Sequence, residues 1–339
     1  MLGRRDVGHR VVVRRIVPGP AGRTRYSDAL GELVELTESH LTLATRDGPL
    51  RVPLAEVHRA KRVPPARRPN AAAVTELELA ADEAWPAPVR ERLGDWLLRA
   101  ADGWTGRANS ALPVGDPDRP LPEAIDAVRR WYAERGQPAL VNVPLPLAAP
   151  VGALLDEQGW GRRPLVLVQT APLAALLDAI PDRPDLPPVE LAVTPSEEWL
   201  ALAAARKAKQ AGTRGERTDG TLPAAAYHVL TAVEQVRFAH VYAEPAAPDG
   251  TRELLAVARG TVTGRGRWLG LTLVEVVPAA RRRGLARHLV RALALWAARL
   301  GATHALLQVE ERNAPAVELY RRLGFTTHHT YQTRTQPPD

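Results

Sequence analysis

The chain has 339 residues, 45% hydrophobic and 24% charged, which is the composition of a globular protein with room for two or three domains. It contains no cysteine, which excludes disulfides, thiolate metal sites and a cysteine nucleophile. The formal net charge is +7, but only three of the 45 basic residues are lysine, so an arginine-rich composition explains this charge better than a nucleic-acid-binding face does.

No segment of the sequence has the features of a membrane or export signal. No apolar run approaches the roughly 18 residues that a membrane span requires. The first residues contain no apolar core of the kind that a secretory signal has. We therefore expect a cytoplasmic protein without a membrane partner, whose positive charge attracts anionic ligands and repels strongly basic ones.

The first stretch of the chain, residues 1–63, has the pattern of a small β domain. Alternating apolar and polar residues predict short strands at 10–15, 31–36, 41–45 and 50–54. Asp47-Gly48 favours a hairpin turn between the last two strands. Several short strands within about 60 residues fit an SH3-like barrel. A proline-rich linker at 64–72 follows.

The middle stretch, residues 73–180, alternates between helical and extended patterns. Helices are predicted at 121–136 and 151–158, and strands at 138–143 and 164–170. This alternation argues for an α/β layer. A second proline-rich linker is predicted at 181–188.

The last stretch, residues 189–335, repeats this style more clearly. Its elements are predicted as strands at 236–243, 254–263, 268–277 and 305–310, a turn at 249–250, a polar loop at 210–221, and a helix at 284–300 with Leu285, Leu289, Leu293, Trp296 and Leu300 on its apolar face. The helix lies between the third and fourth strands in sequence. These elements again argue for an α/β layer.

The turn before that helix has the composition of a phosphate-binding site. Residues 276–286 read Val-Val-Pro-Ala-Ala-Arg-Arg-Arg-Gly-Leu-Ala. Backbone N–H groups and the dipole at such a helix start favour a diphosphate. Gly284 allows close approach of a ligand and an unusual backbone dihedral, and Ala286 is small for the same reason. The alternative is a connection with exposed arginines and no ligand.

The arginines of this turn carry less information than its position. Acidic side chains are preferred at a helix start, so Arg281, Arg282, Arg283 and Arg287 are misplaced unless an anion lies beside them. Arginine is so frequent here that about 0.6 runs of three are expected by chance. The inference therefore depends on the place of the run, between a strand and a glycine that begins an amphipathic helix.

A second motif follows at 313–325. Asn313 is placed to cap a helix, and Pro315 suits the first turn of that helix. Tyr320 lies further along the same predicted helix. A phenol beside a departing thiolate can stabilise it or give it a proton. The alternative is that Tyr320 is a half-buried core residue next to Leu319.

Together the two motifs resemble the coenzyme A site of the GNAT superfamily of N-acetyltransferases, and the resemblance covers about residues 189–335. It implies an α/β fold with a mixed central sheet, acetyl-CoA as cosubstrate, no metal, and direct attack of an amine on the thioester. Tyr320 is then the group that assists thiolate departure, and Val276 offers backbone groups to the pantetheine arm. The cofactor-binding residues implied are Val276, Arg281, Arg282, Arg283, Gly284, Leu285, Ala286, Arg287, Asn313 and Tyr320.

The base that takes the proton from the amine is left open by the sequence. Glu275 lies on the strand that leads into the turn, and Gln308 and Glu310 share one face of the next strand by period-two alternation. Some GNAT relatives have a glutamate at the position that matches Gln308, and a glutamine cannot act as a base. Glu275 and Glu310 remain the candidates, each with the alternative of a solvated or structural role.

Weaker motifs resemble one bacterial GNAT subfamily, which has an N-terminal SH3-like barrel and a degenerate first GNAT-like half. They are residues 8–15, 27–31 and 106–110, the last reading Gly-Arg-Ala-Asn-Ser. Residues 128–136 also echo 316–324, with a tyrosine four residues before a glycine in both, which is typical of tandem halves. Members are often labelled histone acetyltransferases, and no feature of this sequence points to such a substrate.

Two functions are compatible with these observations. The first is an N-acetyltransferase that moves an acetyl group from acetyl-CoA to a primary amine of a small molecule or protein. The second is a non-catalytic module that senses CoA or uses the barrel as a nucleic-acid-binding adaptor. The barrel has little aromatic interleaving beyond Tyr26, which is weak for stacking on bases.

Overall fold

The computed structural model describes residues 2–3, 6–18, 24–45, 48–63, 69–211, 222–244 and 252–338. The chain divides into two units, Met1–Arg68 and Pro69–Asp339. Predictions that involve Asp47, residues 64–68, the loop at 212–221 and the turn at 249–250 lie outside the described residues. None of the described helices is long and apolar enough to cross a membrane.

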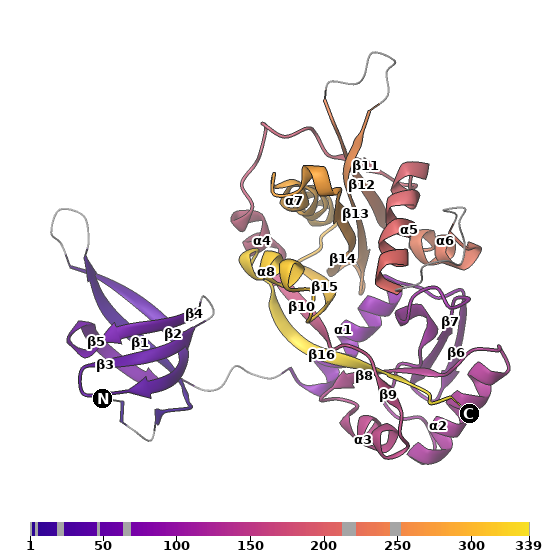
Figure 1. Cartoon of the computed structure of the whole chain (residues 1–339), viewed down its shortest axis with the longest axis horizontal. Helices are drawn as coiled ribbons and strands as arrows, with labels where there is room; N and C mark the ends of the chain where they lie inside the picture. Colours follow the sequence, from indigo (N-terminus) through magenta and orange to yellow (C-terminus); the bar gives the residue numbers. More distant parts are fainter. Residues whose placement is uncertain are drawn as a thin grey trace. The chain divides into compact units, whose positions relative to one another are not determined.

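The N-terminal unit contains a five-stranded antiparallel sheet with the strand order β4-β3-β2-β1-β5 (Figure 1). Its strands are β1 (Arg10–Pro18), β2 (Thr24–Leu36), β3 (His40–Thr45), β4 (Gly48–Pro53) and β5 (Val57–Arg62), with a 3-10 turn η3 at Leu54–Glu56. The buried side of the sheet is formed by Val11, Val13, Ala29, Leu33, Leu41, Leu43 and Val52. The four predicted strands are present, β2 is longer than predicted, and β5 was not predicted.

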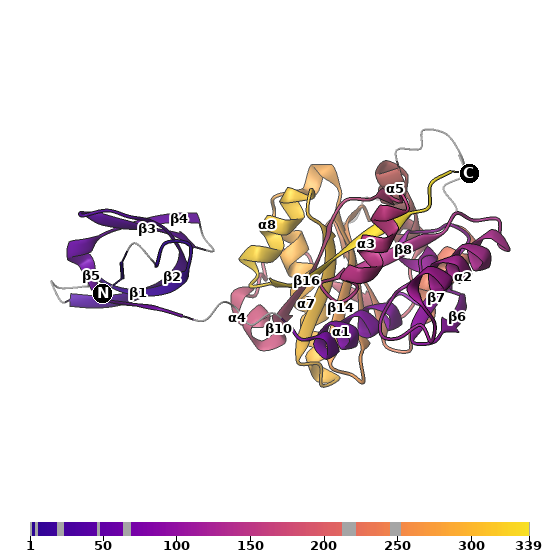
Figure 2. The ribbon, with the colours of Figure 1, turned by 90° about the horizontal axis from the view of Figure 1, so that it is seen from below.

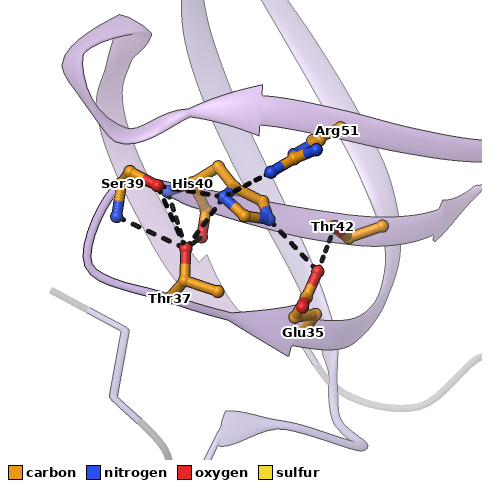
Figure 3. Close-up of polar contacts among 6 residues, drawn as sticks. All are labelled: Glu35, Thr37, Ser39, His40, Thr42 and Arg51. Carbon is orange, nitrogen blue, oxygen red and sulfur yellow. Dashed lines mark hydrogen bonds and ion pairs between the residues drawn. The ribbon is translucent and has the colours of Figure 1, made fainter.

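A polar cluster joins three strands of this sheet (Figure 3). The Arg51 guanidinium can only donate, so its 3.1 Å contact makes Nδ1 of His40 an acceptor. The proton of the His40 ring therefore lies on Nε2, which donates to Glu35 at 3.2 Å. Thr42 also donates to Glu35, at 3.1 Å. These hydrogen bonds, that of His40 first, lower the pKa of Glu35 and hold β2, β3 and β4 in register.

The second unit begins with helices and strands of the middle stretch. These are α1 (Ala71–Glu83), β6 (Val89–Leu93), β7 (Trp96–Ala100), a 3-10 turn η4 (Arg107–Asn109), α2 (Leu121–Ala133), β8 (Leu140–Leu145), α3 (Ala149–Glu157), β9 (Gly161–Arg162), β10 (Val166–Pro172) and α4 (Leu173–Ala179). The two predicted helices and two predicted strands are found as α2, α3, β8 and β10. The others were not predicted.

The last stretch supplies the remaining elements. These are β11 (Glu190–Ala192), α5 (Glu197–Ala211), α6 (Ala224–Thr231), β12 (Val236–Tyr242), β13 (Leu254–Thr263), β14 (Trp268–Val276), a 3-10 turn η5 (Pro278–Ala280), α7 (Leu285–Arg299), β15 (His304–Glu310), α8 (Ala314–Arg322) and β16 (Thr326–Thr335). The predicted strands agree with β12, β13, β14 and β15, and the predicted helix with α7. The prediction that Leu300 belongs to the apolar face of this helix is wrong, because Leu300 is 43% exposed just beyond the end of α7.

One large mixed sheet unites the two stretches, with the strand order β11-β12-β13-β14-β15-β10-β16-β8, and with β9 paired to β16. The pair β14–β15 is parallel, and the other pairs are antiparallel. β10 of the middle stretch lies between β15 and β16 of the last stretch (Figure 1). β16 pairs with β8 of the middle stretch (Figure 2). Each stretch therefore gives a strand to the sheet of the other.

The two faces of this sheet have different covers. Helices α4, α7 and α8 pack on one face, and α5 and α6 lie on the other (Figure 1). The apolar row Leu285, Leu289, Leu293 and Trp296 of α7 is buried, as its spacing predicts. On the opposite face, α1 packs against Val166, Leu306 and Tyr331. Of the catalytic candidates, Glu275 and Glu310 lie at the C-terminal ends of β14 and β15, and Tyr320 lies on α8.

Candidate functional site

The site begins where two parallel strands separate. β14 and β15 pair only from Trp268 to Gly270 and from His304 to Leu306. A bulge opposite Ala258 then turns β14 away, and Leu273 within it has a φ of 53°. Backbone groups of residues 271–277 and 307–310 therefore face an opening instead of each other. A cleft with a volume of about 2590 Å³ occupies this opening, several times the size of an ordinary small-ligand pocket.

The predicted phosphate turn forms one end of the cleft. After η5, residues Arg281 to Arg283 lead into Gly284, which is the N-cap of α7 and has a φ of 95°. No side chain caps this helix, so the N–H groups of its first turn have no side-chain acceptor. A left-handed glycine followed by uncapped N–H groups is a suitable place for an anion.

The arginines of the turn differ in their surroundings. Arg281 pairs with Glu275 at 3.4 Å, and its Nε donates to the carbonyl of Val276 at 3.2 Å. The carbonyl of Val276 thus already has a partner. Arg282, Arg283 and Arg287 line the cleft and make no ion pair with any residue that the structure describes. Leu285 is buried in the core, so only its backbone can serve a ligand.

A further arginine lies at the turn that sequence reasoning did not identify. The predicted linker at 181–188 packs on α7, where His288 donates to the carbonyl of Pro187 at 3.1 Å. Arg183 of this segment is placed so that its Nη1 is 3.0 Å from where a Cβ on Gly284 would stand. Arg183 also pairs with Asp185 at 2.5 Å. Its approach to the turn depends on the fold and has no local sequence signal.

The tyrosine helix lies beside the same cleft. Asn313 is the N-cap of α8 and accepts a hydrogen bond from the N–H of Ala316 at 3.4 Å, as predicted. Tyr320 lines the cleft, although it is only 9% exposed and packs edge-on against Phe325 with ring centroids 5.6 Å apart. Tyr320 can therefore be a core residue and also lie at the site.

The candidate bases are both paired with arginine. Glu275 pairs with Arg281, and Glu310 pairs with Arg312 at 2.7 Å. Gln308 lines the cleft between them, and its Oε1 is buried without a hydrogen-bond partner among the described residues. Gln308 and Glu310 stand opposite Val168 and Val166 of β10, on the face away from α7, as the alternation of the strand predicts.

All predicted site residues line this one cleft. They are Glu275, Val276, Arg281, Arg282, Arg283, Gly284, Leu285, Ala286, Arg287, Glu310, Asn313 and Tyr320. The structure adds residues of the middle stretch to the opposite wall, namely Trp104, Thr105, Gly106, Arg107 and Arg163. The motif at 106–110 was the one sequence signal for this wall.

The corresponding turn of the middle stretch, just before α2, differs in charge. Gly115 has a φ of 92° there, but Asp116 and Asp118 follow it. The Asp95 carboxylate accepts from the N–H of Asp116 at 2.9 Å and stands 2.4 Å from where a Cβ on Gly115 would be. An anion at this turn would therefore meet carboxylates.

Comparisons with known proteins agree with this arrangement. The family model described as "Probable histone acetyltransferase Rv0428c C-terminal" matches residues 71–334. The probable histone acetyltransferase Rv0428c of Mycobacterium tuberculosis is 32% identical over 262 residues, covering 76% of this chain and 72% of that protein. The uncharacterized N-acetyltransferase YobR of Bacillus subtilis is 26% identical over 269 residues, covering 77% and 98%.

Among solved structures, a GCN5-related N-acetyltransferase from Kribbella flavida superposes with a TM-score of 0.54 at 19% identity. The match covers 78% of this chain and 96% of that chain. At this identity the likeness concerns the fold, which is the mixed sheet with its separated strands.

Proposed function

We propose, from the premise that the chain belongs to the Rv0428c C-terminal family and is a GNAT-type N-acetyltransferase, that it moves an acetyl group from acetyl-CoA directly to a primary amine. One observation carries the proposal. A helix start whose N-cap is a left-handed glycine, with three arginines that have no ion pair among the described residues, lies in the same cleft as Tyr320 and the separated strands.

The residues of the cleft suit the parts of the cosubstrate. The N–H groups at the start of α7, with Arg282, Arg283 and Arg287, would hold the diphosphate. The edge of β14 that faces the cleft would bind the pantetheine arm. Bound acetyl-CoA supplies an activated thioester carbonyl. Val276 would use its N–H side in this contact, because its carbonyl accepts from Arg281.

Tyr320 would act at the departing sulfur. The amine forms a bond to the carbonyl carbon, the carbon–sulfur bond breaks, and the Tyr320 hydroxyl donates a proton to the thiolate or stabilises its charge. The ammonium proton of the acceptor must go to a base. Glu275 and Glu310 are the candidates, and the unpartnered Oε1 of Gln308 could position a water that leads to one of them.

The architecture supports a further part of the proposal. The order helix, strand, helix, strand occurs twice, as α2-β8-α3-β10 and as α7-β15-α8-β16. This order matches α2 with α7, so the echo between residues 128–136 and 316–324, which would match α2 with α8, does not follow the repeat. We infer that residues 73–180 are a degenerate GNAT-like half whose acidic turn no longer binds CoA, and that residues 189–335 are the catalytic half. We also propose that residues 1–63 form an SH3-like barrel, with linkers at 64–72 and 181–188, and that the protein acts in the cytoplasm.

Binding of the cosubstrate is tested by the melting temperature of the full chain with and without acetyl-CoA. We expect a rise for the wild type and none for Gly284→Glu, whose carboxylate would take the anion's place beside Arg183. Gly301→Glu is the matched control, because Gly301 has a similar φ of 89° at the other end of α7 and open space around it. It should lower stability by a similar strain and keep the shift.

Catalysis is tested by acetyl-CoA-dependent thiol release with a panel of primary amines. Release with at least one amine is expected. A clear melting shift with no release across the panel would favour a CoA-sensing module, and no melting shift with the wild type would contradict the proposed function itself.

A further inference from the structure

The charges that line the cleft are unequally compensated. Among the described residues, five carboxylates line it, and four of them are neutralised by arginine, in the pairs Arg183–Asp185, Arg281–Glu275, Arg312–Glu310 and Arg322–Glu318. The fifth, Asp102, is exposed. The remaining arginines make no ion pair with described residues and fall into two groups. One group is at the phosphate turn, and the other is Arg107 with Arg163 on the opposite wall.

In the second group, Arg163 lies against the glycine that precedes Arg107 in the chain. The backbone of Gly106 is helical, with φ −64° and ψ −34°, so the conformation does not require glycine. A Cβ at this position would stand 2.6 Å from Nη1 of Arg163. The missing side chain thus makes room for the guanidinium of Arg163 beside Gly106. In the described part of the chain, no ion pair or side-chain hydrogen bond engages that guanidinium.

The rest of the motif at 106–110 holds Arg107 in place. The Asn109 side chain accepts from the N–H groups of Ala101 and Gly103, at 2.8 and 3.0 Å, and donates to the carbonyls of Trp104 and Thr105, at 2.9 and 2.8 Å.

Ser110 extends this support, because its hydroxyl donates to the carbonyl of Arg107 at 3.1 Å and accepts from Arg99 at 2.9 Å. The loop is therefore fixed from within, and Arg107 is its charged residue on the cleft wall.

A buried arginine, Arg259, adds a positive charge near this wall. Arg259 is fully buried, and its guanidinium donates to the carbonyls of Leu230, Val229 and Ala84 but to no carboxylate among the described residues. Burial, and after it the charge of Arg107, lowers the pKa of Arg259 to about 9. Three arginines without an acidic partner therefore raise the potential in this part of the molecule.

This positive wall lies on the side of the sheet that α5 and α6 cover, where Trp104 and Ala108 pack. Tyr320 packs with α7 on one face, whereas Tyr331, which lines the cleft together with Arg107, is on the other face. Tyr331 pairs with Val166, and Val166 pairs with Glu310. Two strand spacings, about 10 Å, thus separate Glu310 from Tyr331. A small molecule with an amine at one end and a carboxylate at the other can span this distance.

We propose that the acceptor is a small amine that also carries a carboxylate, and that Arg107 and Arg163 bind this carboxylate while the amine faces the separated strands. The inference rests on the proposed function and names its substrate class. Guanidinium groups bind carboxylates through charge-assisted, frequently bidentate hydrogen bonds. A lysine-rich peptide would instead bring cations against arginines that have no acidic partner among the described residues.

The test measures product binding, so that it does not depend on turnover. N-acetyl amino acids with small, aliphatic and aromatic side chains are compared with their amides by ligand-observed NMR or calorimetry, on the full chain saturated with CoA. Each pair differs in the carboxylate alone. We expect the carboxylates to bind at least about 10-fold more tightly than the amides.

Variants locate the effect. Arg163→Gln and Gly106→Ala should each remove most of this preference, the second by displacing Arg163 without straining the backbone. Arg130→Gln is the control, because Arg130 is an exposed arginine of the same stretch that does not line the cleft and its loss changes the net charge equally.

Equal binding of acids and amides, a preference that survives Arg163→Gln, or no binding of either set would overturn the proposal. Failure of the proposed function is distinguishable, because it would appear as a wild-type chain whose melting temperature does not respond to acetyl-CoA.

Discussion

Tyr320 combines a ring that packs in the core with a hydroxyl for which we propose a role in the reaction. Its ring packs against Phe325 within the core, and its hydroxyl is the part that chemistry at the cleft would use. Removing only the oxygen should therefore test the chemistry with little cost to the packing.

We expect Tyr320→Phe to lower kcat by about 100-fold, the smaller end of what a positioned proton donor contributes, with an unchanged affinity for acetyl-CoA. Thiol release at saturating acetyl-CoA measures the first quantity, and the melting shift measures the second. Phe325→Leu is a packing control, which should lower stability and leave kcat near that of the wild type. Full activity in Tyr320→Phe would assign Tyr320 to the core alone.

Residues whose signal is local were predictable from the sequence. Gly284 stands between a strand pattern and a helix pattern, and Asn313 precedes a proline at a helix start, so each could be placed without knowing the fold. Arg163 and Arg183 could not, since each meets its part of the site only through contacts between distant segments. Arg107 was visible as part of a motif, but the loop that carries it is held by the hydrogen bonds of Asn109.

At the scale of elements, α8 combines a predicted cap with a charge network that favours the helix. Glu318 pairs with Arg321 at 2.8 Å and with Arg322 at 2.6 Å, one helical turn further on. Hydrogen bonds from Arg321 and then Arg322 lower the pKa of Glu318 from 4.5 to about 2. The pair is solvent-exposed, so its effect on stability is small.

The sign of the pH dependence follows from that lowered pKa. The folded chain holds Glu318 ionised more strongly than the unfolded chain does, so the pairs stabilise above about pH 4.5 and lose this effect as the pH falls toward 2. Glu318→Gln should therefore melt below the wild type at neutral pH, and the gap should close in acid.

Melting curves from pH 7 to pH 2.5 measure this gap. Glu157→Gln, an exposed glutamate without a described ion pair at the end of α3, is the control. A gap for Glu318→Gln that is independent of pH would assign the effect to helix propensity instead.

The elements that the sequence missed share a physical reason. β16 reads Thr-Thr-His-His-Thr-Tyr-Gln-Thr-Arg-Thr and has no apolar alternation. It is a strand because β10 and β8 lie on either side of it, and its polar side chains find partners such as Glu78 for His329, at 2.7 Å, and Asn142 for Thr333, at 2.6 Å. Tertiary pairing decides such a segment, whereas α7 carries its own pattern.

At the scale of the whole molecule, the exchange of β10 and β16 makes the two stretches depend on each other. Without residues 69–188, the last stretch would expose the edge of β15 along all seven of its pairs with β10 and would lose the cover of α1. The predicted boundary at 181–188 stays a prediction about evolutionary halves, because the sheet itself runs across it.

We therefore expect residues 189–339, expressed alone, to be insoluble or unfolded, and residues 69–339 to fold and to keep the melting shift with acetyl-CoA. Circular dichroism and melting curves of the two fragments decide this. A cooperative transition in the shorter fragment would contradict the interdependence. Loss of the acetyl-CoA shift in the longer one would show that residues 1–68 contribute to the site.

The exchanged strand also constrains the order in which the chain can acquire its structure. Thr330 of β16 pairs with Leu145 of β8, a separation of 185 residues (330 minus 145). During synthesis, β8 and the helices α2 and α3 emerge long before the strand that completes their sheet, so an unpaired edge must persist while the whole last stretch is made. We expect the pairing of β16 with β8 to make folding slow. We also expect the nascent chain to need a chaperone that covers the unpaired edge until β16 has been synthesised.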